Sequence, residues 1–132
     1  HALVQWCHGA PGFVGADLAV HASARAADRG LATYYRGLLA AKGPGLGDGI
    51  AGTGAALLSL FTYTGDAAWL ERARRFAVFL APRVDELEAH ADQPSALFQG
   101  SAGALAFFAD VLKPENARLG APDFDGAAVD PF

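Results

Sequence analysis

Three copies of one short glycine motif divide this chain into units of similar length. The copies are Gly9-Ala10-Pro11-Gly12, Gly49-Ile50-Ala51-Gly52 and Gly100-Ser101-Ala102-Gly103. They start at positions 9, 49 and 100, so successive copies lie 40 and 51 residues apart. A period of this size is typical of repeat proteins whose unit contains two helices and two turns. The spacing therefore predicts a fold built by stacking such units.

The residues between the tetrads favour two kinds of helix. The stretch after Gly52 is rich in Ala and Leu and nearly uncharged, so we expect a helix that is buried on all sides. After a turn with Asp66 as helix cap, a second helix carries an apolar stripe beside charged residues, as expected for one exposed face. The stripe consists of Trp69, Ala73, Phe76 and Leu80. The segment 25–39 is expected to be another such outer helix.

Alternating buried and half-exposed helices predict an all-α fold. No window alternates apolar and polar residues in the manner of a strand. The helices form either an open solenoid or a partial α/α toroid (α/α barrel) built from helical-hairpin repeats. Residues 82–99 are expected to be a polar connection, and residues 119–132, which lack periodicity, an irregular tail.

Composition excludes several classes of function. The net charge is −4, with no basic cluster of the kind that binds nucleic acid. The single cysteine, Cys7, rules out an internal disulfide and fits a reducing compartment. No apolar run is long enough for a transmembrane segment. The sequence begins at His1 and contains no Met, so we expect a fragment of a longer cytoplasmic protein.

The side chains best suited to metal binding or catalysis lie just before the first tetrad. Cys7 and His8 are adjacent, and both side chains are common zinc ligands. An isolated pair of this kind is also compatible with a structural cysteine beside a surface histidine. For His21 and His90, ordinary surface positions are expected.

Four segments together resemble the lanthionine synthetase C-like (LanC-like) family. They are Leu3-Val4-Gln5-Trp6-Cys7-His8-Gly9-Ala10-Pro11-Gly12, Gly45-Leu46-Gly47-Asp48-Gly49-Ile50-Ala51-Gly52, Ser95-Ala96-Leu97-Phe98-Gln99-Gly100-Ser101-Ala102-Gly103, and Phe108-Ala109-Asp110-Val111-Leu112-Lys113-Pro114 with Ala117-Arg118. Their order and spacing also match. The resemblance implies that residues 1–118 are the carboxy-terminal part of a LanC-like toroid, and Trp6-Cys7-His8 resembles the eukaryotic-like type.

The resemblance also implies a chemistry. Family members hold zinc with one Cys from a first loop and a Cys-His pair from a second loop. The metal activates a thiol, from glutathione or from a peptide Cys, for addition to a dehydroamino acid in a peptide. The implied partners are therefore glutathione or a peptide substrate, together with the remainder of the toroid. Peripheral association with the plasma membrane is left open.

The metal site of this sequence departs from that pattern. Cys7 matches the first ligand, but the Cys-His pair of the second loop falls on Gly47 and Asp48. Glycine cannot ligate through a side chain, whereas the Asp48 carboxylate can. Cys7 and Asp48 are thus the candidate zinc ligands of a degenerate site, and His8 is the candidate catalytic residue for proton transfer. All of this requires the three glycine loops to converge on a common centre.

Three functions remain open at this level. The chain can belong to an enzyme that adds thiols with altered metal ligands. It can instead belong to a non-catalytic toroid that binds glutathione or a peptide or acts as a scaffold. A third alternative is an unrelated toroid that processes sugars, which needs paired carboxylates at the ends of inner helices. Its candidates are Asp17, Asp48 and Asp110.

Overall fold

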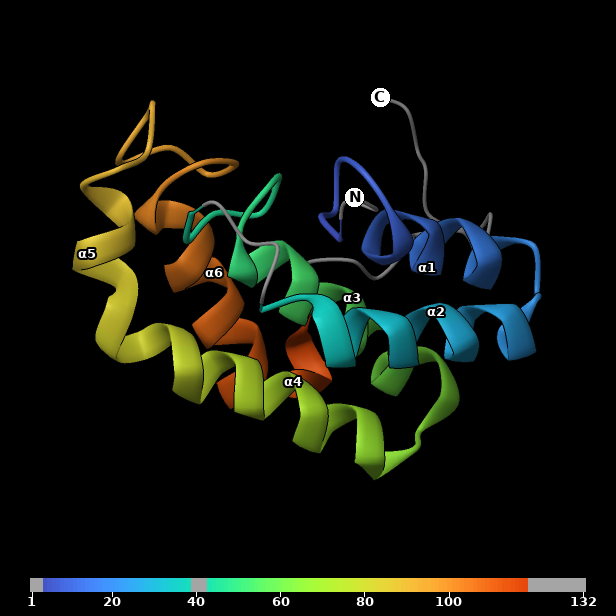
Figure 1. The fold of residues 1–132 in the computed structure, drawn as a ribbon. Helices are drawn as coiled ribbons and strands as arrows, with labels where there is room; N and C mark the ends of the chain where they lie inside the picture. The colour runs from blue at the N-terminus through green and yellow to red at the C-terminus, as the bar shows by residue number, and fades with distance from the viewer. Residues whose placement is uncertain (1–3, 39–42, 119–132) are drawn as a thin grey trace, which may run out of the picture.

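The computed structural model describes residues 4–38 and 43–118, and this part of the chain is helical (Figure 1). Its elements are α1 (Ala10–Ala19), α2 (Ser23–Arg36), α3 (Ile50–Thr64), α4 (Ala67–Leu80), η1 (Ala81–Arg83), α5 (Val84–Glu88), α6 (Ser101–Leu112) and η2 (Pro114–Asn116). Within these ranges the only β-type pairing is an isolated bridge between Val4 and Gly9. The all-α prediction is confirmed. The tail predicted for residues 119–132 lies outside the described residues.

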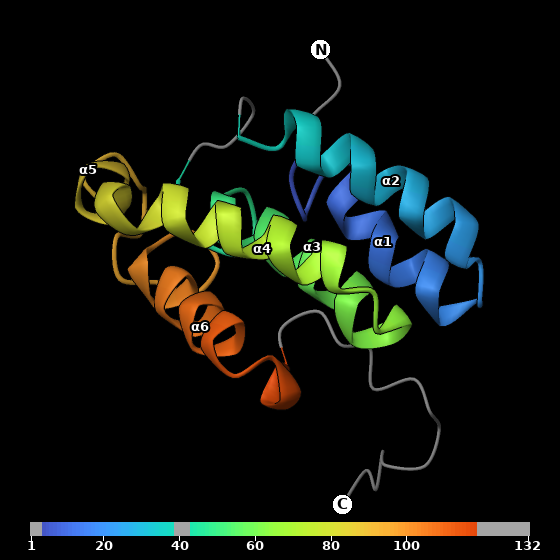
Figure 2. The same cartoon turned by 90° about the horizontal axis from the view of Figure 1, so that it is seen from below.

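The helices alternate between an inner and an outer row. The inner helices α1, α3 and α6 each begin at the second residue of one glycine tetrad, and the outer helices α2 and α4 pack across the gaps between them (Figures 1 and 2). Helix α3 occupies the centre and contacts α1, α2, α4 and α6. Inner and outer helices that alternate in this way are the arrangement of an α/α toroid.

Burial along the helices follows the sequence pattern. Every residue of α3 from Ile50 to Leu60 is buried, as expected for a helix without a polar face. In α4 the buried residues are those of the predicted stripe, Trp69, Ala73, Phe76 and Leu80. The Asp66 carboxylate caps α4 by accepting a hydrogen bond of 2.9 Å from the backbone N–H of Ala68. The connection 82–99 is more helical than expected, because η1 and α5 follow directly after α4 and continue the helical structure.

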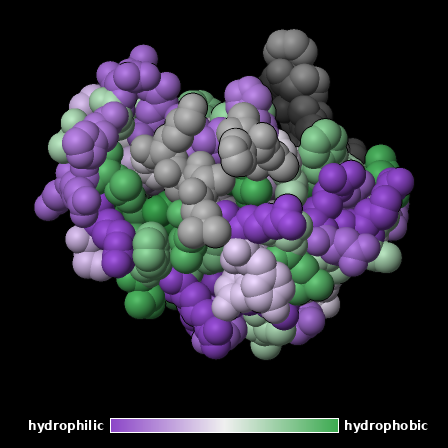
Figure 3. All heavy atoms as spheres, in the orientation of Figure 1, coloured by the Kyte–Doolittle hydropathy of each residue, from purple (hydrophilic) through white to green (hydrophobic). Residues whose placement is uncertain are grey.

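Charged side chains cover much of the outer face of the molecule. Exposed Arg, Asp and Glu residues belong to α2, α4 and α5, with apolar side chains between them (Figure 3). In the described ranges, no helix combines the length and the apolar character that crossing a membrane requires.

The last glycine of each tetrad lies in the first turn of its helix and allows the preceding loop to fold back over that turn. A Cβ atom on Gly12 would overlap the carbonyl oxygen of Trp6, which lies six residues earlier. The same overlap would occur between Gly52 and Leu46, and between Gly103 and Leu97. All three repeats therefore place a backbone carbonyl where any other residue carries its side chain. This shared contact explains why the motif recurs.

We predict that Gly52→Ala destabilises the protein by at least about 2 kcal/mol, because the obstructing atom belongs to backbone that cannot rotate away. The matched control is Gly15→Ala in α1, where a Cβ meets nothing within 4 Å. That change should stabilise the protein by about 0.5–1 kcal/mol. Urea unfolding measures both values, and equal effects of the two substitutions would contradict the account.

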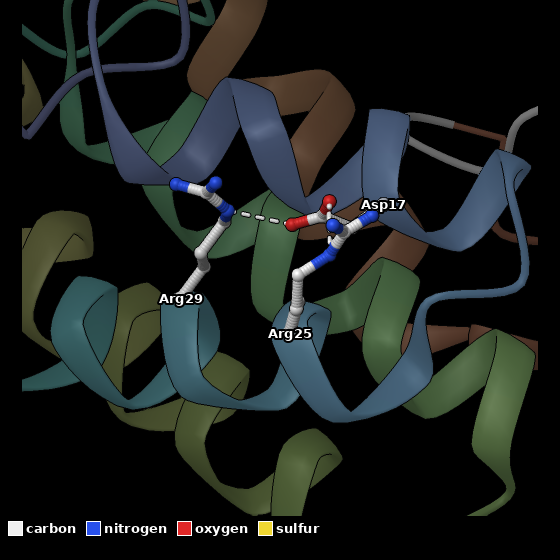
Figure 4. Close-up of polar contacts among 3 residues, drawn as sticks. All are labelled: Asp17, Arg25 and Arg29. Atoms are coloured by element: carbon white, nitrogen blue, oxygen red, sulfur yellow. Dashed lines mark hydrogen bonds and ion pairs between the residues drawn. The ribbon is translucent and has the colours of Figure 1, made fainter.

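A carboxylate on α1 binds two arginines of α2 and so fixes the first hairpin (Figure 4). Asp17 Oδ2 accepts a hydrogen bond of 2.6 Å from Arg29 Nε, and Oδ1 lies 3.4 Å from Arg25 Nε. The Asp17 side chain is only 10% exposed. The Arg29 guanidinium also lies 4.7 Å from the centre of the Phe13 ring. Because this carboxylate is largely removed from water, its pairing stabilises more than an exposed pair does.

Replacing Asp17 with Asn should lower the free energy of unfolding by about 1–2 kcal/mol, because the neutral amide no longer offers Arg25 and Arg29 a negative charge. The exposed pair of Glu71 and Arg75, at 3.2 Å, provides the comparison. Glu71→Gln should lower stability far less than Asp17→Asn does, because solvent screens this exposed pair. Chemical denaturation of both variants checks this difference, and a Glu71 effect as large as that of Asp17 would refute it.

Candidate functional site

The three loops that precede α1, α3 and α6 lie along the same side of the molecule, at the upper edge in Figure 1. Each loop contains the residues immediately before its tetrad. Backbone carbonyls of the second and third loops cap the helices that follow. The N–H of Ile50 donates to Gly43 O at 3.0 Å, and the N–H of Ser101 donates to Pro94 O at 2.8 Å. Loop backbone thus satisfies helix N–H groups that would otherwise lack partners.

The same loops are joined to one another by backbone hydrogen bonds. The N–H of Cys7 donates to Gly47 O at 2.9 Å, and the N–H of Gly47 donates to Phe98 O at 2.7 Å. Each of these three residues stands five positions before the last glycine of its tetrad. Equivalent positions of successive repeats therefore form a continuous chain of hydrogen bonds. The loops converge, as the sequence analysis required.

A pocket of about 360 Å³ opens where the loops meet. It is lined by Gln5, Trp6, Cys7, His8, Gly47, Asp48, Phe98 and Gln99. The three predicted site residues, Cys7, His8 and Asp48, are therefore brought together. Their roles as ligands or catalyst stay predictions. Cys7 is exposed, and its Sγ lies 3.0 Å from His8 Nδ1.

The donor set of this pocket does not fit the zinc site that the family resemblance implies. Tetrahedral zinc in proteins is held by three or four Cys, His or carboxylate ligands. In the described part of the chain, no three such residues are grouped so that they could hold a metal ion. The reason lies in the second loop, where Gly47 offers only backbone at the position expected to provide a thiolate. Cys7, His8 and Asp48 share a pocket without forming a ligand cage.

The pocket contains polar residues that the sequence analysis did not single out. Gln5 is 2% exposed. Gln99 has a buried side-chain oxygen, Oε1, for which the described residues provide no hydrogen-bond donor. The repeat itself carried the signal for Gln99. It follows Phe98 as His8 follows Cys7 and as Asp48 follows Gly47, so all three side chains occupy the same position in their loops.

The carboxylates of the sugar-processing alternative are not brought together. Asp48 lines the pocket, but Asp17 is bound by arginines on α2. Asp110, in the last turns of α6, accepts a hydrogen bond from the backbone N–H of Arg118 at 2.9 Å.

His21, for which a surface position was expected, is exposed and forms a hydrogen bond: its Nδ1 lies 2.6 Å from the hydroxyl of Tyr63. His21 follows the carboxyl end of α1 and Tyr63 lies in the last turn of α3, so the pair is at the opposite ends of these helices from the loops.

Comparison with known proteins agrees with these features. The family model for lanthionine synthetase C-like proteins matches residues 1–125. The chain is 34% identical over 129 residues to the LanC-like protein GCL1 of Arabidopsis thaliana, with 89% of this chain and 29% of the relative covered. It is 35% identical over 126 residues to a zebrafish (Danio rerio) protein named glutathione S-transferase LANCL1, with 89% and 30% covered.

The chain thus spans less than a third of the length of these relatives. Within that length, the match runs through all three glycine loops and all the described helices. The chain belongs to the lanthionine synthetase C-like family.

Proposed function

We propose that the pocket at the three loops binds glutathione or a similar thiol-bearing peptide, and that this protein does so without stoichiometric zinc. The chain would act as part of a larger LanC-like toroid that binds its ligand rather than as a zinc-dependent enzyme. Support for the ligand class comes from the zebrafish relative, which is named a glutathione S-transferase.

The proposal rests mainly on one observation, the three equivalent loop positions occupied by Cys7, Gly47 and Phe98. Only one of them carries a thiol. A complete structural zinc site provides about 10–16 kcal/mol of binding free energy in small peptides. Loss of a thiolate and replacement of an imidazole by a carboxylate remove much of that affinity, because sulfur and nitrogen are the preferred donors for zinc.

The polar groups left in the pocket suit a peptide ligand. The Asp48 carboxylate is an acceptor for an ammonium group, and the buried Oε1 of Gln99 is an acceptor for an amide N–H. Glutathione carries both kinds of donor. A donor that reaches Gln99 relieves an unsatisfied buried acceptor, and this adds to affinity.

A second candidate function is thiol addition to a dehydroamino acid, which the family resemblance implies. The observation that favours it is the approach of His8 Nδ1 to within 3.0 Å of Cys7 Sγ in the same pocket. An imidazole at this place could accept the proton of a bound thiol and return it to the adduct. Turnover of a dehydroalanine peptide with glutathione that is lost in His8→Ala would favour this candidate.

We predict that the purified full-length protein contains well below one zinc per chain. Changing Gly47 to Cys together with Asp48 to His should raise the zinc content, because it supplies the two side chains that the family pattern contains. A Cβ at Gly47 would lie 3.2 Å from Phe98 O, so the third loop must move only slightly. Stoichiometric zinc in the wild type that is lost in Cys7→Ser would contradict this proposal.

For the ligand, we expect saturable binding of glutathione by isothermal calorimetry. Asp48→Asn should weaken this binding about tenfold, because a charge-assisted hydrogen bond is worth about 1.5–3 kcal/mol. The control is Asp28→Asn, which changes an exposed carboxylate on α2 outside the pocket. Equal affinities of wild type and Asp48→Asn, or the absence of glutathione binding, would refute the proposed role of the pocket.

A further inference from the structure

A second, apolar pocket adjoins the pocket of the three loops. Its volume is about 230 Å³, and Trp6 and Phe98 line both pockets. The remaining lining of the second pocket comes from the loops, from α3 and from the second residue after η2: Leu46, Gly52, Ala55, Leu97 and Arg118. A ligand in the polar pocket therefore has an apolar pocket directly beside it.

The shared wall exposes large apolar side chains to solvent. Trp6 is 46% exposed, Leu97 42% and Phe98 56%. These three residues come from two loops that the backbone hydrogen bonds hold together through the second loop. Exposed apolar residues that gather around a concave site are a common mark of ligand binding.

The apolar pocket has one charged residue in its lining, Arg118. Its backbone N–H donates to Asp110 Oδ2 at 2.9 Å, which fixes the position of the residue against α6. Its guanidinium forms no ion pair with any carboxylate of the described ranges. A cation that forms no ion pair within the described residues, at the edge of an apolar pocket, favours a ligand that presents an anionic group next to an apolar one.

We infer that this pocket is a specificity subsite for a peptide that carries a branched aliphatic side chain beside an acidic residue. The inference rests on the proposed binding of a thiol-bearing peptide and names the class of peptide. The Cys of the ligand occupies the polar pocket with His8 and Asp48. The aliphatic side chain of the neighbouring residue enters the apolar pocket between Leu46 and Leu97, and the acidic side chain pairs with Arg118.

The test uses the full-length protein and eight synthetic peptides, each with one Cys. The two residues beside the Cys are Leu-Glu, Gly-Glu, Leu-Gln or Gly-Gln, and each of these four pairs is placed on either side of the Cys. Binding is measured by fluorescence anisotropy, and the comparison uses the side of the Cys on which the Leu-Glu pair gives tighter binding. On that side we expect the Leu-Glu peptide to bind about tenfold more tightly than the Gly-Glu peptide, because burial of the Leu side chain adds to the free energy of binding. It should bind about fivefold more tightly than Leu-Gln.

Two variants assign these preferences to residues. Arg118→Gln should abolish the preference for Glu over Gln and leave the preference for Leu over Gly. Leu97→Asp should abolish the preference for Leu. The matched control for Arg118 is Arg74→Gln on α4, an exposed arginine outside both pockets, which should change neither preference.

The outcomes separate this inference from the proposed function. If the wild type binds glutathione but all eight peptides bind equally, the subsite is refuted and the proposed function stands. If neither glutathione nor any peptide binds, both fail. If Arg118→Gln and Leu97→Asp lower the melting temperature of the ligand-free protein without changing the peptide preferences, this surface contacts another part of the longer chain, and the inference is overturned.

Discussion

The chain of backbone hydrogen bonds from Cys7 through Gly47 to Phe98 sets the geometry of the site. It exists because each loop folds back onto its own helix, and this fold-back requires a residue without a side chain at the end of every tetrad. The packing of the helices then sets only the distance between the positions at which the three loops begin. Once the loops are joined, side chains at the next position of each repeat, His8, Asp48 and Gln99, line one pocket.

The repeat also shows how the site differs from its family pattern. The hydrogen bonds between the loops join backbone atoms, so they do not depend on which side chains the linked residues carry. Gly47 keeps its place in the chain of hydrogen bonds although it offers no metal ligand. The backbone hydrogen bonds that shape the pocket are therefore independent of the side chain at position 47.

Local patterns in the sequence predicted the helices well, because burial follows residue type along each helix. The uncharged stretch after Gly52 predicted the part of α3 that is buried, Ile50 to Leu60, and the stripe from Trp69 to Leu80 predicted the buried face of α4. Gln99 and Arg118 could not be assigned in this way. Their significance depends on which loops meet and on where the chain passes after α6, and both result from packing between residues far apart in sequence. Only the repeat register pointed to Gln99.

Amide hydrogen exchange tests the link between the loops most directly. The N–H groups of Cys7 and Gly47 lie in irregular loops, where amides normally exchange with solvent almost as fast as in an unfolded chain. If the loops are joined as described, both amides should exchange at least about a hundredfold more slowly than the unfolded rate. Exchange of either amide at the rate of an unstructured peptide would contradict the convergence of the three loops.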